Sequence, residues 1–188
     1  MIFASLSPGD LAAVCPTHRD LRSPAEPFLY AHIQWTWSDS QSPPIAQFLR
    51  SIVHRPELAS YVYDVVLNGD SFDGGLHDPG NESPKILVTN VFLDKLVEYI
   101  ERINVPYARE WIQELHAGSM DAFTTLLISQ LLNLKRLFLN KNFNRENRLR
   151  GMVLRSALCE ESIGSHLNSF THLKDILAEC PCLPYDIR

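Results

Sequence analysis

The sequence predicts a helix-rich α/β fold in which helices alternate with short parallel strands. One observation is the stretch Leu126–Phe143, where apolar residues at helical spacing give way to the pattern Leu134-x-x-Leu137-x-Leu139. The other is that this three-position spacing recurs twice elsewhere in the chain. The matching residues are Val62, Val65 and Leu67, and then Leu173, Ile176 and Ala178. A single helix and strand cannot bury their shared apolar face, so the recurrence predicts an array of such units.

Helices are expected before and between these strands, because apolar residues recur there at i, i+3 and i+4. The predicted ranges are 45–53, 91–103, 108–115 and 147–159, and a further helix that Ser119 begins leads into the strand at Leu134. Ile86–Val88 suggests an additional strand. The repeated motifs begin at unequal intervals, at positions 62, 134 and 173, so the expected array is irregular. It is an open α/β sheet or a short solenoid.

Composition and charge limit the classes of function. The chain has 188 residues with 45% apolar and 21% charged, which suits one ordinary folded domain. Its net charge of −5 argues against a general nucleic-acid binder, and nucleic acid is an unlikely partner. The segment 135–155 nevertheless contains seven Lys or Arg residues against one acid, which leaves a net charge of −11 for the remainder. This basic run predicts a surface for an acidic target segment, or else a solvated helix face.

No cofactor, metal or catalytic group is expected. The loop Asn68–Gly75 lacks the acidic ladder of a calcium site, and Cys180-Pro-Cys182 near His172 and Cys159 lacks zinc-ligand spacing. No motif of nucleophilic, phosphate-binding or metalloprotease chemistry occurs, so the chain is not expected to be an enzyme. Four cysteines do not suggest a disulfide framework, and no apolar run approaches the ~20 residues that span a bilayer. These features predict a protein of the cytoplasm or nucleus without a membrane partner.

The N-terminal segment predicts short helices. Ser7 is placed to cap a helix that starts at Pro8, with Asp10 in its first turn. Ile2–Ile33 is expected to form two or three short helices, broken at Pro24 and Pro27. The polar, proline-containing stretch 38–44 then predicts a linker. Trp35 and Trp37 are expected to pack where this helical part meets the body, or to anchor a partner if they are exposed.

The order of residues in this segment resembles the F-box. The residues that carry the resemblance are Ile2, Phe3, Leu6, Asp10, Leu11, Val14, Cys15 and Arg19, followed by Phe28-Leu29-Tyr30. With AEPFLYAHIQWTW and PPIAQFLRSIVHRPELASYV after it, the chain is similar to F-box proteins of filamentous fungi that carry degenerate leucine-rich-repeat-like regions. The usual L-P-x-E-I/L opening would lie before Met1, so the expected F-box is N-terminally truncated.

The resemblance implies a domain plan. Residues 1–37 would be a partial F-box-like helical segment, 38–60 a linker and connecting helix, and 61–188 an irregular leucine-rich-repeat-like α/β region with a small parallel sheet. Regular leucine-rich repeats have 20 to 29 residues, so this array would be degenerate, with long inserted helices.

The resemblance also implies a function. The chain would be a non-enzymatic substrate adaptor of an SCF-type (cullin–RING) ubiquitin ligase, which docks on a Skp-type linker protein. The residues expected on the linker side, or packing within the helical cap, are Leu6, Leu11, Val14, Cys15 and Leu21. Those expected to contact the target are Lys135, Arg136, Lys141 and Arg145. The alternative is a repeat-type interaction scaffold that no longer docks on the ligase, because its F-box is incomplete.

Overall fold

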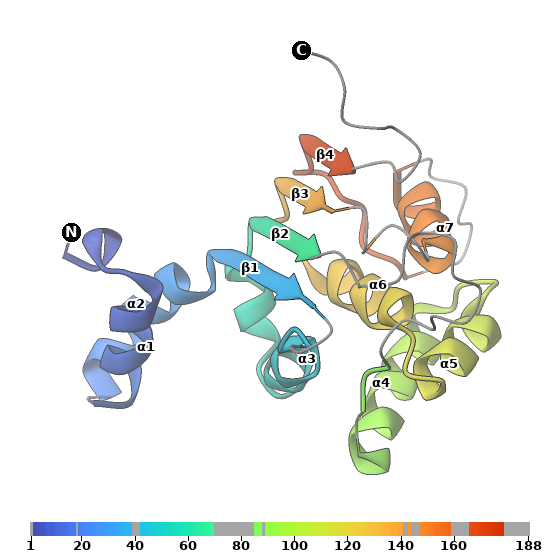
Figure 1. Ribbon diagram of the computed structural model, residues 1–188, viewed down its shortest axis with the longest axis horizontal. Helices are drawn as coiled ribbons and strands as arrows, with labels where there is room; N and C mark the ends of the chain where they lie inside the picture. The colour runs from blue at the N-terminus through green and yellow to red at the C-terminus, as the bar shows by residue number, and fades with distance from the viewer. Residues whose placement is uncertain are drawn as a thin grey trace.

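A four-stranded parallel sheet with helices against one of its faces organises the molecule (Figure 1). The computed structural model describes residues 2–17, 19–38, 42–69, 85–87, 89–140, 143, 147–158 and 166–178. The strands are β1 (His32–Trp37), β2 (Asp64–Gly69), β3 (Arg136–Leu139) and β4 (Asp175–Ala178). They lie side by side in chain order, and every neighbouring pair is parallel. The predicted helix-rich α/β class is therefore confirmed.

Equivalent positions of the recurring apolar motif pair with one another across the sheet. Val65 pairs with Leu137, and Leu137 with Ile176, so one position of each motif forms a continuous row across β2, β3 and β4. The next row in the same direction joins Leu67, Leu139 and Ala178. Because side chains two residues apart point to the same face of a strand, both rows face the helices. All three predicted strands are present.

The strand β1 was not expected, and the prediction that helix extends to Ile33 was wrong. His32–Trp37 alternates polar and apolar residues, and this period of two places Ile33, Trp35 and Trp37 on the inner face. Trp35 packs edge-on against Phe48, with ring centroids 5.7 Å apart, while Trp37 is only 2% exposed. Residues 32–37 thus belong to the same sheet as β2, and the segment predicted as linker and connecting helix lies between two neighbouring strands.

The N-terminal helices lie beside the start of β1, at the left of Figure 1. A 3-10 turn (Ile2–Ser5) precedes α1 (Pro8–Thr17) and α2 (Arg19–Tyr30). Ser7 caps α1 as predicted: the Asp10 amide donates to the Ser7 Oγ atom over 3.2 Å, and that hydroxyl donates to the Asp10 carboxylate over 2.6 Å.

The predicted breaks at Pro24 and Pro27 do not occur. Both prolines lie inside α2, which runs without interruption from Arg19 to Tyr30. Each proline removes one backbone donor, but the turn between them is anchored by tertiary contacts. Ala25 is fully buried and the carboxylate of Glu26 is held by two arginines. Packing has therefore overridden the local preference of the sequence.

Helices cover the inner face of the sheet. They are α3 (Ile45–His54), the 3-10 helix η2 (Pro56–Tyr61), α4 (Asn90–Ile103), α5 (Ala108–His116), α6 (Met120–Gln130) and α7 (Arg148–Leu158). The predicted helices are confirmed to within a few residues. Every side chain from Met120 to Ser129 is buried, so α6 is the centre of the core. The other helices and the sheet pack around it (Figure 1).

The suggested additional strand is not formed at Ile86 and Leu87, and Val88 lies outside the described residues. The Ile86 amide instead donates to the Gly118 carbonyl over 2.9 Å, which ties this segment to the turn before α6. Gly118 has φ of +78°, and a Cβ atom there would come within 2.8 Å of the Ile86 carbonyl oxygen. Only glycine satisfies both constraints without strain.

Candidate functional site

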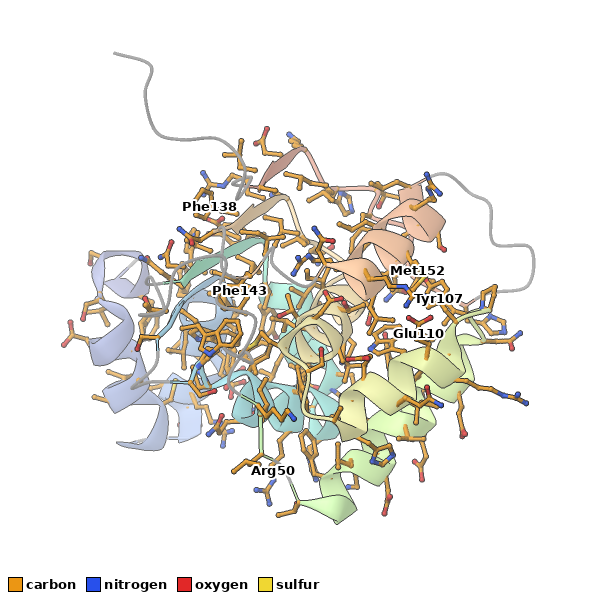
Figure 2. All side chains as sticks on the ribbon, turned by 45° about the vertical axis from the view of Figure 1, so that its right-hand side comes forward. Arg50, Tyr107, Glu110, Phe138, Phe143 and Met152 are labelled. Atoms are coloured by element: carbon orange, nitrogen blue, oxygen red, sulfur yellow. The ribbon has the colours of Figure 1, made fainter. Side chains whose placement is uncertain are left out.

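The face of the sheet turned away from the helices is uncovered by any described helix, and we refer to it as the outer face. Its side chains alternate with the buried inner rows and are exposed or half-buried. They are His32, Gln34, Thr36, Asp64, Val66, Asn68, Arg136, Phe138, Asp175 and Leu177. Figure 2 shows Phe138 on this side, away from Met152 and Tyr107 on the helical side. The outer face thus presents side chains of all four strands to solvent.

A polar network lies where the strands begin. The Asp64 carboxylate accepts from the His32 Nδ1 atom over 3.0 Å and from the Arg136 guanidinium. The Tyr63 hydroxyl donates to the other ring nitrogen of His32 over 3.0 Å. The ammonium of Lys135 lies 5.4 Å from the centre of the Tyr63 ring, a cation–π contact. The network links three strands at one edge of the outer face and fixes the directions of its charged side chains.

A groove of about 580 Å³ runs along the outer face from β2 to β4. Its apolar lining includes the outer-face residues Val66, Phe138 and Leu177 together with Leu137 and Ile176, and its charged rim is Asp64, Arg136, Lys174 and Asp175. Leu177 is 63% exposed, which is unusual for a large apolar side chain in a strand. An apolar floor with a few charged groups around it is the usual composition of a binding site.

Two of the four predicted target-side residues lie at this groove or beside it. Lys135 and Arg136 are exposed at the start of β3, and Arg136 lines the rim. Lys141 and Arg145 lie outside the described residues. No sequence pattern singles out Lys174 or Leu177, because their place beside Arg136 and Phe138 follows from the pairing of β3 with β4.

The basic run 135–155 is not one surface. Arg150 is 2% exposed; its guanidinium donates to the Phe143 carbonyl over 2.7 Å and lies 3.8 Å from the Asp121 carboxylate. Burial lowers the pKa of Arg150, and the Asp121 charge opposes that shift. The Asp121 carboxylate also accepts from the Leu149 amide over 2.8 Å, at the start of α7. Arg150 therefore joins α7 to α6 and contributes nothing to a partner surface.

The predicted linker-side residues differ in exposure. We refer to the N-terminal helices up to Tyr30 as the helical cap. Leu11 is 3% exposed and packs inside this cap, while Leu6, Val14 and Cys15 are half-buried. Burial raises the pKa of the Cys15 thiol. Leu21, on α2, is 42% exposed. Of these five residues, Leu21 is the most exposed to solvent.

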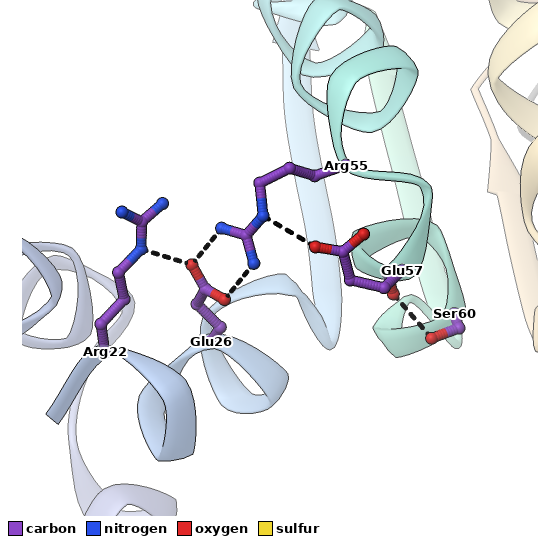
Figure 3. A network of polar contacts seen from close by, with 5 residues as sticks. All are labelled: Arg22, Glu26, Arg55, Glu57 and Ser60. Atoms are coloured by element: carbon purple, nitrogen blue, oxygen red, sulfur yellow. Dashed lines mark hydrogen bonds and ion pairs between the residues drawn. The ribbon is translucent and has the colours of Figure 1, made fainter. Parts of the chain in front are cut away.

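An ion-pair network fastens the helical cap to the body of the protein (Figure 3). The Glu26 carboxylate accepts two hydrogen bonds from the Arg55 guanidinium, at 2.6 and 2.7 Å, and one from Arg22 at 2.7 Å. Arg55 also donates to Glu57 over 2.8 Å. Hydrogen bonding to Arg55 lowers the pKa of Glu26 to about 2. Because Arg55 lies between α3 and η2, this network connects α2 to these two helices.

Nothing in the described residues forms a metal centre. No group of three His, Cys, Asp or Glu side chains there is arranged to hold an ion. The loop 70–75 and the cysteines at positions 159, 180 and 182 lie outside the described residues.

A second cavity, of about 440 Å³, lies on the helical side and is lined by Lys95, Tyr99, Arg102 and Leu132 among others. In the part of the chain that the structure describes, no helix has the length and apolarity needed to cross a bilayer.

No protein-family model, no curated protein and no solved structure matches this chain. The resemblance to F-box proteins therefore stays a prediction from the sequence. Function has to be inferred from the outer face, the helical cap and the charges that they carry.

Proposed function

We propose that this chain is a non-enzymatic protein-binding adaptor that serves as the substrate-recognition subunit of an SCF-type ubiquitin ligase. The outer face is the observation that carries the proposal. Helices cover one side of the sheet, whereas the other side presents an apolar groove with a charged rim. Arrays of stacked strand–helix units offer such extended open surfaces to their partners.

In this proposal the two ends of the molecule have separate roles. The outer face holds the target, with Phe138 and the cations at the start of β3 as its main contacts. The helices α1 and α2 dock on the Skp-type linker, with Leu21 as the exposed apolar contact. The chain then needs no chemistry of its own, because it only holds the target near the conjugating enzyme.

Co-purification with a Skp-type linker tests the docking half of the proposal. The full chain is mixed with purified linker and the complex is measured by gel filtration. We expect Leu21→Asp to weaken the association at least tenfold, because a buried apolar contact would be replaced by a charge. Leu158→Asp on α7 is the matched control, since Leu158 is similarly exposed at 49% but lies far along the chain in another helix. If the unaltered chain does not bind the linker, the adaptor proposal is wrong.

A repeat-type scaffold that binds a target without the ligase is the second candidate. The burial of Leu11 and the partial burial of Leu6, Val14 and Cys15 favour it, since these side chains are largely used within the cap. Such a scaffold would bind a target through the outer face yet show no association with the linker. The same gel-filtration experiment separates the two candidates.

A further inference from the structure

The rim of the outer groove carries more accessible positive than negative charge. Lys135, Arg136 and Lys174 are exposed at the starts of β3 and β4. Of the two nearby acids, Asp64 has a side chain only 14% exposed and already accepts from Arg136 and His32. The charges of Asp64 and Arg136 offset each other, so Lys135 and Lys174 supply the excess positive charge. Asp175 is the remaining exposed acid on the rim. In a chain with a net charge of −5, this edge is locally basic, and it favours a ligand that carries carboxylates.

The floor of the groove favours an apolar side chain beside those carboxylates. Val66 and Phe138 are half-buried and Leu177 is largely exposed, so together they leave a partly open apolar surface. A ligand side chain seated there would remove apolar area from water on both partners. The groove of 580 Å³ has room for one or two large side chains.

The rest of the outer face suits a polypeptide backbone. Gln34, Thr36 and Asn68 lie toward β1 and offer neutral hydrogen-bond donors and acceptors. Neighbouring strands lie about 4.8 Å apart, so four strands span roughly 14 Å, which about four or five extended residues cross. A nucleic acid fits less well, because the floor offers one aromatic ring, half-buried, for stacking, and Asp175 faces the same rim.

We propose that the groove binds an extended peptide segment in which an apolar side chain sits on Phe138 and Leu177 while adjacent carboxylates pair with Lys174, Lys135 and Arg136. This inference rests on the proposed function, because it names the chemistry of the target that the outer face would hold. It concerns the target side only, and does not depend on docking to the linker.

Selection from a random library of 12-residue peptides on the immobilised full chain tests the proposal. We expect the enriched peptides to contain Asp or Glu next to a large apolar residue. A fluorescent peptide made from the most enriched sequence is then titrated by polarisation. Lys174→Glu should weaken its binding about tenfold or more, since attraction becomes repulsion. Leu177→Ser should weaken it several-fold, while Lys95→Glu, which changes an exposed lysine on the helical side, should change it less than twofold.

Four results would overturn the proposal: no enrichment over a blank surface, enrichment of basic peptides, equal loss in Lys174→Glu and Lys95→Glu, or no loss in either. Matching thermal unfolding of each variant and the unaltered chain shows that the fold is intact, and Lys174→Gln replaces Lys174→Glu if the latter unfolds. The linker experiment distinguishes the two proposals. Linker binding without peptide enrichment rejects only the groove, and enrichment without linker binding rejects only the ligase role.

Discussion

The two edges of the sheet differ in how well they are covered. β1 and β4 each pair with a single neighbouring strand, and Ile33 and Ile176 occupy the same inner row. Ile33 is nevertheless buried at 5% exposure, whereas Ile176 is 41% exposed. The same residue type in the same row thus has two different environments.

The described segments that follow the two edge strands also differ. α3 follows β1 and places Phe48 against Trp35, and Phe143 packs against Trp37 with 5.4 Å between ring centroids. In the described residues, no helix follows β4. Both edge strands have one strand neighbour in the described residues, and the one that a described helix follows is the buried one. The outer groove lies beside the less covered of the two edges.

The largest effect on stability is expected at the buried polar contact between α6 and α7, where α7 is the helix between β3 and β4. Asp121→Ala removes the acceptor of the Leu149 amide and leaves the buried Arg150 without its carboxylate. We expect a loss of about 3–5 kcal/mol in the free energy of unfolding, because the buried Arg150 charge loses the carboxylate that faces it and the Leu149 amide loses its acceptor. Urea unfolding measures the loss, and hydrogen exchange should show β4 losing protection before β1.

A surface ion pair of the same helix provides the control. Arg148 is paired with Glu110 at 2.8 Å, but the Arg148 side chain is 77% exposed. Glu110→Gln should therefore cost less than about 1 kcal/mol. A comparable loss in the two variants would mean that the Asp121 site is no more important than an exposed pair.

The next prediction compares the two edges directly. Ile33→Ala should lower the free energy of unfolding by about 2–4 kcal/mol, because it opens a cavity in a buried site. Ile176→Ala should cost less than about 1 kcal/mol, because the side chain is already partly in water and its loss leaves no enclosed void. Urea unfolding of both variants gives the comparison. Equal losses would show that Ile176 is covered in solution as completely as Ile33.

Three of the four strands, β2, β3 and β4, are predictable from the sequence. The spacing shared by Val65, Leu137 and Ile176 identified three strands, since a period of two fixes which side chains share a face. The pairing of these same positions across the sheet was not predicted and comes from the structure. β1 was missed, although HIQWTW alternates cleanly, because the helical spacing before it was extended too far. Tyr30, Ile33 and Trp35 have the same three-position spacing, with aromatic residues at the first and third positions.

The functional surface was predictable only in part. Lys135 and Arg136 could be proposed from the position of the strand, but Arg150 was counted with them and is buried instead. Whether a charge in such a run is exposed depends on how α7 packs on α6, which no local pattern encodes. The groove itself combines residues from positions 64 to 177, so it exists only after the strands have paired.

The ion pair of Glu26 with Arg55, which fastens α2 beside β1, should depend on pH. Hydrogen bonds lower the pKa of Glu26 from 4.5 in the unfolded chain to about 2, so its stabilisation is complete above pH 5 and is lost as pH falls toward 2. We expect Glu26→Gln to cost about 1–3 kcal/mol at pH 7, and the difference from the unaltered chain to shrink steadily below pH 5. Urea unfolding between pH 2 and 7 measures it. A difference that is independent of pH would show that the Glu26 charge does not hold α2 to the body.

The smallest effects are expected on the outer face, where the contrast between the edges should vanish. Leu177→Ser on β4 and Gln34→Ala on β1 both change exposed side chains, and each should alter the free energy of unfolding by no more than about 0.5 kcal/mol. Thermal or urea unfolding of the two variants tests this. A large loss in Leu177→Ser would mean that Leu177 packs against the protein itself and does not serve a partner. Near-neutral results at both edges would show that the outer face contributes little to folding, so its apolar groove is free to bind another molecule.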